Sequence, residues 1–304
     1  MSYRKESYYK YRGYSQKNTV GIDASKLSLE ALKDLWHKTI NEGFHGICFS
    51  MYEDGQQPGD DISFDQVDRR VQILKPYVEA IRSFSCIEGN EHVPVAAKKH
   101  GLNTLVGAWL GDDKEDNDKE IDGLISLAKA GYVDVAAVGN EVLYRNDLSL
   151  EELLAYISRV KDALSGLDIP VGYVDAYYEF SRHPELVEHS DVILTNLYPY
   201  WEGCPIEYAL GHMQAMYGQV VDAANGKPII ITETGWPSEG GSLKGAVAGD
   251  IAAMKYFIDT ISWTKENNIP IFYFSSFDES WKVGDEGDVG AYWGLWNKNE
   301  NLKY

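Results

Sequence analysis

From about residue 46 onward, hydrophobic positions in this chain follow two alternating patterns. Short apolar runs rich in Val, Ile and Ala and closed by Gly, Asn or Ser are typical of strands in a buried parallel sheet. Eight such runs occur, at residues 46–51, 78–83, 104–109, 133–139, 170–174, 191–196, 228–232 and 270–276. Between them lie amphipathic stretches long enough to cross back over a sheet, at residues 64–77, 118–129, 150–164, 206–224 and 246–267.

This alternation predicts the α/β class and, within it, a closed (β/α)8 TIM barrel rather than an open doubly wound sheet. No G-x-G-x-x-G fingerprint follows any of the strand-like runs, which argues against a dinucleotide-binding fold. We expect one catalytic domain over residues 1–304, with the barrel at 46–304 and an N-terminal extension at 1–45.

The extension contains a predicted helix at residues 28–43, with Ser28 as its N-cap and Gly43 at its end. Such a helix either caps the bottom of the barrel or packs beside it as an extra helix. Residues 2–18 are basic and rich in tyrosine, and they lack the apolar core of a signal peptide.

Charge and cysteine content narrow the range of functions. The net charge of -19, from 47 acidic and 28 basic residues, argues against a nucleic-acid or anionic-membrane partner because phosphates are repelled. No run approaches the roughly 18 apolar residues of a membrane span. The three cysteines, Cys48, Cys86 and Cys204, have no metal-type spacing, so we interpret them as small buried apolar residues.

Two glutamates stand directly after strand-like runs: Glu141 in the sequence VGNE and Glu233 in the sequence IIITETGWP. Barrel enzymes carry their active sites at the C-terminal ends of the strands, so the two carboxyl groups are expected at one rim. Glycoside hydrolysis requires two carboxyl groups, one to protonate the leaving oxygen and one to act as nucleophile or base. The sequence therefore predicts a sugar-cleaving enzyme, although Glu141 taken alone is more simply a helix cap or a surface acid.

Neighbouring residues strengthen this interpretation. Asn140 beside Glu141 is suited to hydrogen-bond a sugar 2-hydroxyl, and Trp236 offers an apolar platform for a sugar ring. The segment FDESWK, residues 277–282, ends the last run with Phe277, Glu279, Trp281 and Lys282 and is typical of a sugar subsite. Lys282 is placed to pair with Glu279. The pair is either a surface ion pair that adds little stability or a device that helps to set the protonation state of a neighbouring carboxyl group.

Aromatic residues gather at the predicted strand ends, where they suit the apolar faces of sugar rings. Candidates for sugar contact are Trp109, Tyr198, Tyr200 and Trp201. With 8 tryptophans and 21 tyrosines in the chain, many such rings serve packing alone, and we expect sugar contact from about half of those at strand ends.

Metal chemistry is not expected. The acidic run at residues 111–118 lacks the Gly and Glu spacing of an EF-hand and is better suited to cap the helix that follows it. The seven histidines form no H-E-x-x-H motif and no defensible Ser-His-Asp order. We predict neither a metal nor a cofactor.

Taken together, these motifs resemble glycoside hydrolase family 17, the β-1,3-glucanases and β-1,3-glucanosyltransferases, and most closely its bacterial branch. The resemblance covers about residues 46–296. The matching segments are ICFSMY at 47–52, IRSF at 81–84, EHVP at 91–94, GAWL at 107–110, VGNEV at 138–142, HPEL at 183–186, YPYW at 198–201, ETGWPS at 233–238 and FDESWK at 277–282.

The resemblance implies a TIM barrel and a retaining mechanism in which Glu141 is the acid/base and Glu233 the nucleophile. In retaining enzymes the two carboxyl groups lie about 5 to 5.5 Å apart. It also implies that Asn140, Arg82 and Tyr198 support the reactive sugar.

The same resemblance places Glu279, Trp281 and Lys282 at the border of the reactive sugar. The first matching segment ends at Tyr52, which we also expect to contact the substrate. The sequence departs from the family as well. Relatives often carry tryptophan near residues 177–178 and a different residue at Asn196.

We therefore predict a retaining hydrolase of laminarin-type β-1,3-glucan, and we expect it to be endo-acting. One alternative is a β-1,3-glucanosyltransferase that uses the same two glutamates, and a lower-ranked one is a β-glucan-binding protein without catalysis. The expected partner is β-1,3-glucan, the expected state is a monomer, and the polymeric substrate points to secretion or the cell envelope. A cytoplasmic address stays open because no signal peptide is found in the sequence.

Overall fold

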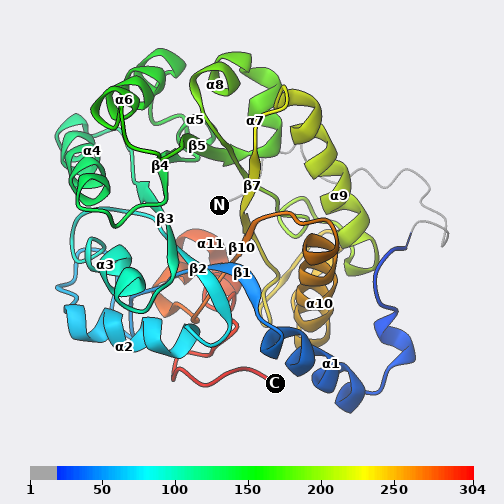
Figure 1. Ribbon diagram of the computed structural model, residues 1–304. Coiled ribbons are helices and arrows are strands. Elements are labelled where there is room, and N and C mark those ends of the chain that lie inside the picture. The colour runs from blue at the N-terminus through cyan, green and yellow to red at the C-terminus, as the bar shows by residue number, and fades with distance from the viewer. Residues whose placement is uncertain (1–18) are drawn as a thin grey trace.

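The computed structural model describes residues 19–304, and its centre is a closed barrel of eight parallel strands (Figure 1). The strands are β1 (Phe44–Cys48), β2 (Val78–Ser83), β3 (Asn103–Ala108), β4 (Val135–Asn140), β5 (Val171–Ala176), β6 (Ile193–Asn196), β7 (Ile229–Thr234) and β10 (Ile271–Tyr273). Neighbours around the barrel follow chain order, and β10 closes the barrel by pairing with β1. The predicted TIM barrel is confirmed.

Most of the helices surround the barrel on its outside, whereas the short α11 lies within their ring in this view (Figure 1). The helices are α1 (Leu29–Asn41), α2 (Phe64–Leu74), α3 (His92–Lys99), α4 (Lys114–Lys129), α5 (Val142–Arg145), α6 (Leu150–Ala163), α7 (Tyr177–Arg182), α8 (Pro184–His189), α9 (Ile206–Ala223), α10 (Asp250–Glu266) and α11 (Val283–Glu286). Short 3₁₀ turns lie at Ala24–Lys26, Ser280–Lys282 and Gly287–Val289, and β8 (Ser242–Leu243) pairs with β9 (Ala246–Val247) in a small hairpin.

Most element boundaries lie within a few residues of their predicted places. The first strand begins at Phe44, two residues before the expected start of the barrel at residue 46, and α4 begins at Lys114, four residues before its predicted start at residue 118. The last long helix also differs, because residues 246–247 belong to β9 and the helix begins at Asp250. The helices α3, α7 and α8 fill intervals for which the hydrophobic pattern named no helix.

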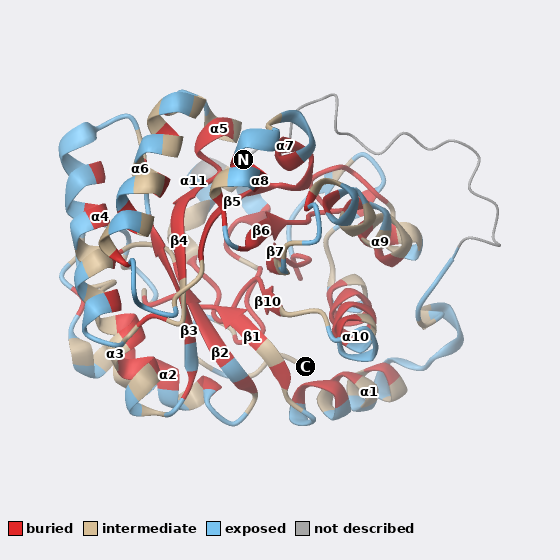
Figure 2. Ribbon diagram, turned by 45° about the horizontal axis from the view of Figure 1, so that its top comes forward, coloured by how far each residue is buried: buried red, intermediate tan, exposed pale blue. Residues whose placement is uncertain are grey.

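Burial follows the layers of a barrel (Figure 2). The strands are almost entirely buried, and all six residues of β5 are buried. The surrounding helices turn a buried face inward and an exposed face outward (Figure 2). The three cysteines are free and buried, as expected for small apolar residues.

The helix α1 packs on the side of the barrel against α10 (Figure 1). The Ser28 side chain accepts a hydrogen bond from the backbone N–H of Ala31 at 3.1 Å, as its predicted N-cap role requires. The ring centroids of Trp36 and Phe257 lie 5.7 Å apart at the contact between the two helices. This is the position of an extra helix in the outer ring, the second of the two expected arrangements. The tyrosine-rich segment discussed above lies outside the described residues.

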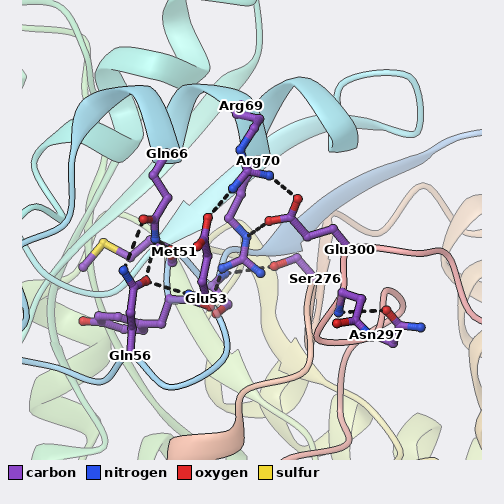
Figure 3. Close-up of polar contacts among 12 residues, drawn as sticks. Met51, Glu53, Gln56, Gln66, Arg69, Arg70, Ser276, Asn297 and Glu300 are labelled. Carbon is purple, nitrogen blue, oxygen red and sulfur yellow. Dashed lines mark hydrogen bonds and ion pairs between the residues drawn. The ribbon is translucent and has the colours of Figure 1, made fainter.

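A buried arginine ties the end of the chain to α2 (Figure 3). The guanidinium of Arg70 lies 4.0 Å from the centre of the Phe277 ring, and its Nε lies 3.2 Å from a carboxylate oxygen of Glu300. Its Nη1 donates to the backbone carbonyl of Tyr52, so one side chain connects α2, the loop after β1 and the C-terminal segment. The adjacent Arg69, which is partly exposed, pairs with the same Glu300.

No helix within residues 19–304 has both the length and the apolar character needed to cross a membrane.

Candidate active site

Glu141 lies at the junction of β4 and α5, in a backbone conformation that few residues other than glycine adopt. Its φ of 53° is in the left-handed region, which costs on the order of 1 kcal/mol for a residue with a side chain. Two backbone hydrogen bonds of 2.8 Å hold the turn, from the Glu141 N–H to the Val174 carbonyl and from the Arg145 N–H to the Glu141 carbonyl. The carboxyl group is thereby fixed on the inner side of the strand ends, where Asn196 meets it.

Glu233 lies near the end of β7, and both of its carboxylate oxygens accept hydrogen bonds. Arg82 Nη1 donates to Oε1 at 2.6 Å, and the Tyr198 hydroxyl donates to Oε2 at 2.8 Å. Arg82 Nη2 also donates to the side-chain carbonyl of Asn140 at 2.7 Å. One buried guanidinium thus joins Glu233 to the residue that precedes Glu141.

A second link runs through Asn196 at the end of β6. Its amide nitrogen donates to Glu141 Oε1 at 2.9 Å, and its carbonyl oxygen accepts from the Thr232 hydroxyl at 2.8 Å. Thr232 directly precedes Glu233. Each glutamate is therefore connected to the neighbour of the other, which brings both to the same rim of the barrel.

Burial raises the pKa of Glu141 to about 8, and the negative charges of Glu233 and Asp175 contribute in the same direction. The hydrogen bond from Asn196 and the charge of Arg145 oppose this shift. At neutral pH the Glu141 carboxyl group therefore carries a proton, as a general acid must before it acts.

The segment after β10 forms a connected polar and aromatic group. Lys282 Nζ lies 2.6 Å from Glu279 Oε2, and the Trp281 indole donates to Glu279 Oε1 at 3.2 Å. Burial opposes the charge of Lys282, but the carboxylates of Glu279 and Glu286 outweigh it and raise the pKa of the ammonium group. The ring of Tyr52 meets that of Trp281 edge to face, with centroids 5.8 Å apart.

The aromatic candidates occupy two kinds of position. Trp109 is partly exposed, and the guanidinium of Arg145 lies 4.5 Å from its ring. Tyr52 and Trp281 are half-buried. Trp201 is largely buried, with 9% of its surface exposed. These rings retain some surface for contact with a ligand.

Trp236, Tyr200 and Phe277 are buried instead. The indole of Trp236 donates to the Val247 carbonyl at 2.9 Å, and its ring packs edge to face on Tyr200. Phe277 lies beneath the guanidinium of Arg70. All three rings therefore pack inside the protein. The region is tightly packed, since a Cβ at the neighbouring Gly235 would lie 2.0 Å from the Phe274 carbonyl oxygen.

The sequence did not point to the role of Asn196 or to that of Asp175. Asn196 was noted only as a departure from the family, yet its amide contacts Glu141 directly. Asp175 is fully buried on β5 and acts on the charge state of Glu141. A polar residue near the end of an otherwise apolar strand was the available signal, as it was for Asn140.

Asp113 caps α4 by accepting hydrogen bonds from the backbone N–H groups of Glu115 and Asp116, at 2.8 and 3.2 Å. This is the role expected for the acidic run. Within residues 19–304, no group of three or more His, Cys, Asp or Glu side chains is arranged to hold a metal ion.

The TIM barrel and its paired glutamates at the strand ends define a glycoside hydrolase. The chain belongs to the BtgE/BtgC glycoside hydrolase domain family, whose match spans residues 46–294. The family-level resemblance to β-1,3-glucan-active enzymes is confirmed.

Relatives of known name agree with this assignment. The glucan 1,3-beta-glucosidase of Schizosaccharomyces pombe is 31% identical over 253 residues, which cover 77% of this chain and 78% of the relative. The glucan 1,3-beta-glucosidase of Saccharomyces cerevisiae is 27% identical over 267 residues, which cover 80% and 85%.

Among solved structures, the glycoside hydrolase family 17 β-1,3-glucanosyltransferase of Rhizomucor miehei is 32% identical with a TM-score of 0.78, covering 86% of this chain and 96% of that one. An active-site mutant of the same enzyme, solved with laminaritriose, gives the same values. The endo-laminarinase of Formosa Hel1_33_131, at 20% identity and a TM-score of 0.73, shares the fold and covers 88% of this chain and 87% of that one.

Proposed function

We propose that this protein cleaves β-1,3-linked glucan of the laminarin type by a retaining, double-displacement mechanism. The observation that carries the proposal is the different state of the two carboxyl groups. Glu233 is ion-paired with Arg82, whereas burial keeps Glu141 protonated at neutral pH. The names of the relatives, glucan 1,3-beta-glucosidases and a β-1,3-glucanosyltransferase, support the choice of substrate.

In the first step, Glu141 donates its proton to the glycosidic oxygen while Glu233 attacks the anomeric carbon, and a glycosyl-enzyme forms. In the second step, the Glu141 carboxylate takes a proton from water as that water attacks the anomeric carbon and displaces Glu233. Arg82 and Tyr198 orient the nucleophile by holding both of its oxygens. Asn140, held by Arg82, is placed to contact the sugar 2-hydroxyl.

We assign the flanking subsites to the polar and aromatic group after β10 and to rings that keep some exposed surface. Tyr52, Trp281, Glu279 and Lys282 form one side, and Trp109 and Trp201 offer further ring surface. We propose endo action on a monomeric enzyme, membership of the bacterial branch of the family, and an address outside the cell or in its envelope. The relatives named above from Schizosaccharomyces, Saccharomyces and Rhizomucor are fungal, so the bacterial branch rests on the motifs alone.

The second candidate function is β-1,3-glucanosyl transfer, in which a sugar hydroxyl replaces water in the second step. The Rhizomucor miehei enzyme favours it, because that chain is named as a glucanosyltransferase and is 32% identical. A time course of laminari-oligosaccharide digestion distinguishes the two, since transfer yields elongated products and hydrolysis yields shortened ones.

The decisive test is the variant Glu233→Gln, which keeps a hydrogen-bond acceptor for Arg82 and avoids leaving a buried cation without any partner. We expect turnover of laminarin to fall on the order of 10⁴-fold, as for loss of a nucleophile, while binding measured by calorimetry persists. The exposed Glu239, changed to Gln, serves as a control that retains activity.

An unchanged rate in Glu233→Gln would remove the assignment of the nucleophile. A wild-type protein that binds laminari-oligosaccharides but yields neither shortened nor elongated products would instead support the non-catalytic alternative.

A further inference from the structure

The fifth strand carries a buried carboxyl group that the two-step mechanism does not use. Asp175 is fully buried, and no salt bridge to it is found within residues 19–304. Its Oδ2 accepts a hydrogen bond from the Tyr173 hydroxyl, and its Oδ1 accepts from the backbone N–H of Ala176 at 2.7 Å. A buried carboxyl group held by neutral donors alone is costly, so its presence calls for a reason.

The same two side chains hold the backbone that follows the proton donor. The hydroxyl of Tyr173 accepts from the backbone N–H of Leu143 at 3.0 Å, and Asp175 also receives a hydrogen bond from the backbone of Tyr144. Leu143 and Tyr144 lie two and three residues beyond Glu141. Because Glu141 adopts a left-handed conformation, the turn depends on such contacts to keep its shape.

We infer that Asp175 and Tyr173 form a positioning pair for Glu141: they fasten the turn that aims its carboxyl group and place a buried negative charge beside it. The inference rests on the proposed function, in which Glu141 is the acid/base. The pair touches the backbone after Glu141 and acts on the reaction only through that residue.

Charges around Glu141 agree with this role. Glu233 from β7 and Asp175 from β5 both raise the pKa of Glu141, while Asn196 from β6 and Arg145 from α5 lower it. Glu233 becomes neutral when the glycosyl-enzyme forms, so its contribution disappears at that stage. The charge of Asp175 persists, and it helps to keep Glu141 a competent base in the second step.

The groups around Asp175 set its own pKa close to neutral pH. Burial raises the pKa of Asp175 to about 7, and Glu179 from α7 adds to the rise, while hydrogen bonds from Tyr173, Ala176 and Tyr144 oppose it. Asp175 therefore ionises at a lower pH than Glu141, whose pKa is raised to about 8. Above neutral pH the charge of Asp175 is present and holds the proton on Glu141.

The first test is the pH dependence of kcat for Asp175→Asn on laminari-oligosaccharides. Removal of the negative charge lowers the pKa of Glu141, so the alkaline limb of the profile should move to lower pH, by on the order of one unit. The matched control is Asp259→Asn, which removes a buried carboxylate on α10 that pairs with Lys255. The control should lose stability while its alkaline limb stays in place.

The second test uses Tyr173→Phe, which removes the hydroxyl that joins Leu143 to Asp175. We expect kcat on laminari-oligosaccharides to fall about tenfold, a fraction of what a general acid supplies. Dinitrophenyl β-laminaribioside has a leaving group that needs no proton. On this substrate the rate of glycosyl-enzyme formation should change less than about twofold. A merely structural role would slow this step on both substrates alike.

An alkaline limb that does not move in Asp175→Asn, or equal losses on both substrates in Tyr173→Phe, would overturn the inference. If Asp175→Asn does not fold, the leaving-group comparison in Tyr173→Phe decides alone. These outcomes differ from a failure of the proposed function, which would show as a wild-type protein inactive on laminarin and on the activated substrate.

Discussion

The charge state of Glu141 is set by neighbours that act in opposite directions. Burial, Glu233 and Asp175 favour the protonated form, and Asn196 and Arg145 favour the ionised form. No single contact produces the shift, so each neighbour can be altered alone to move it in a direction known beforehand.

Asn196 offers the clearest case, because its amide donates to the carboxyl group itself. In Asn196→Ala the pKa of Glu141 should rise, and the alkaline limb of the kcat profile should move to higher pH, opposite to the shift in Asp175→Asn. Loss of the orienting hydrogen bond should also lower kcat by about tenfold. A rate profile on laminari-oligosaccharides between pH 5 and 10 measures both effects.

Thr232→Val is the control for that variant, since it removes only the hydrogen bond to the Asn196 carbonyl. Its alkaline limb should move less than that of Asn196→Ala. A downward shift in Asn196→Ala would contradict the role assigned to the amide.

Sequence reasoning identified Glu141, Glu233, Arg82 and Tyr198 as candidates because each lies in a local motif. It did not identify Asn196 as a partner of Glu141, since 55 residues separate the two and the contact depends on the barrel bringing β4 and β6 together. Trp236 shows the converse, because the motif that contains it gives no sign that Tyr200 and Val247 enclose the ring.

At the scale of elements, strands were predictable wherever an apolar run is buried by the barrel itself. The hairpin of β8 and β9 was not, because the contacts that hold it come from elsewhere in the chain. Gly245 N–H donates to the Gly203 carbonyl at 3.1 Å, and the Val247 carbonyl accepts the Trp236 indole. These tertiary contacts take residues 246–247 out of the helix that the local pattern favoured.

The connection between α2 and the C-terminal segment gives a prediction at this scale. In Arg70→Met, Glu300 loses a buried partner and the Tyr52 carbonyl loses a donor. We expect a loss of about 3 kcal/mol in the free energy of unfolding, which lowers Tm by about 6 °C in a protein of this size. We also expect a higher KM for laminari-oligosaccharides, because Tyr52 packs on Trp281.

Arg69→Met is a matched control, since Arg69 pairs with the same Glu300 but 45% of its side chain is exposed. Such a pair contributes about 1 kcal/mol at most, so Tm should change by about 2 °C or less. Equal losses in both variants would contradict the view that burial of Arg70 makes it the structural link.

For the whole molecule, the alternation of eight apolar runs with amphipathic stretches was enough to predict the barrel. This hydrophobic pattern could not show which acidic residues of the protein lie on the surface and which are buried. Among residues 19–304, burial raises the pKa of several enclosed carboxyl groups: Asp278 to about 6, Asp175 and Glu120 to about 7, and Glu141 to about 8, and it raises the pKa of Asp259 as well.

These groups predict how stability depends on pH. A carboxyl group with a higher pKa in the folded protein than in the unfolded chain binds more protons when folded, so stability falls as pH rises between the two values. Here that interval runs from about 4 to about 8. The ion-paired carboxyl groups with lowered pKa values, such as that of Glu152, are at least partly exposed and oppose this trend only weakly.

Tm measured by calorimetry should therefore be highest near pH 5 and fall by several degrees towards pH 8. The overall charge of -19 acts in the same direction, because repulsion among the negative charges destabilises the folded protein. Added salt screens this repulsion and should recover only the part of the Tm loss that it causes. Because Glu141→Gln and Asp175→Asn each remove a buried ionisation, both variants should flatten the slope between pH 6 and 8. A Tm that rises over this range in the wild-type protein would mean that these carboxyl groups are not held in their neutral form by burial.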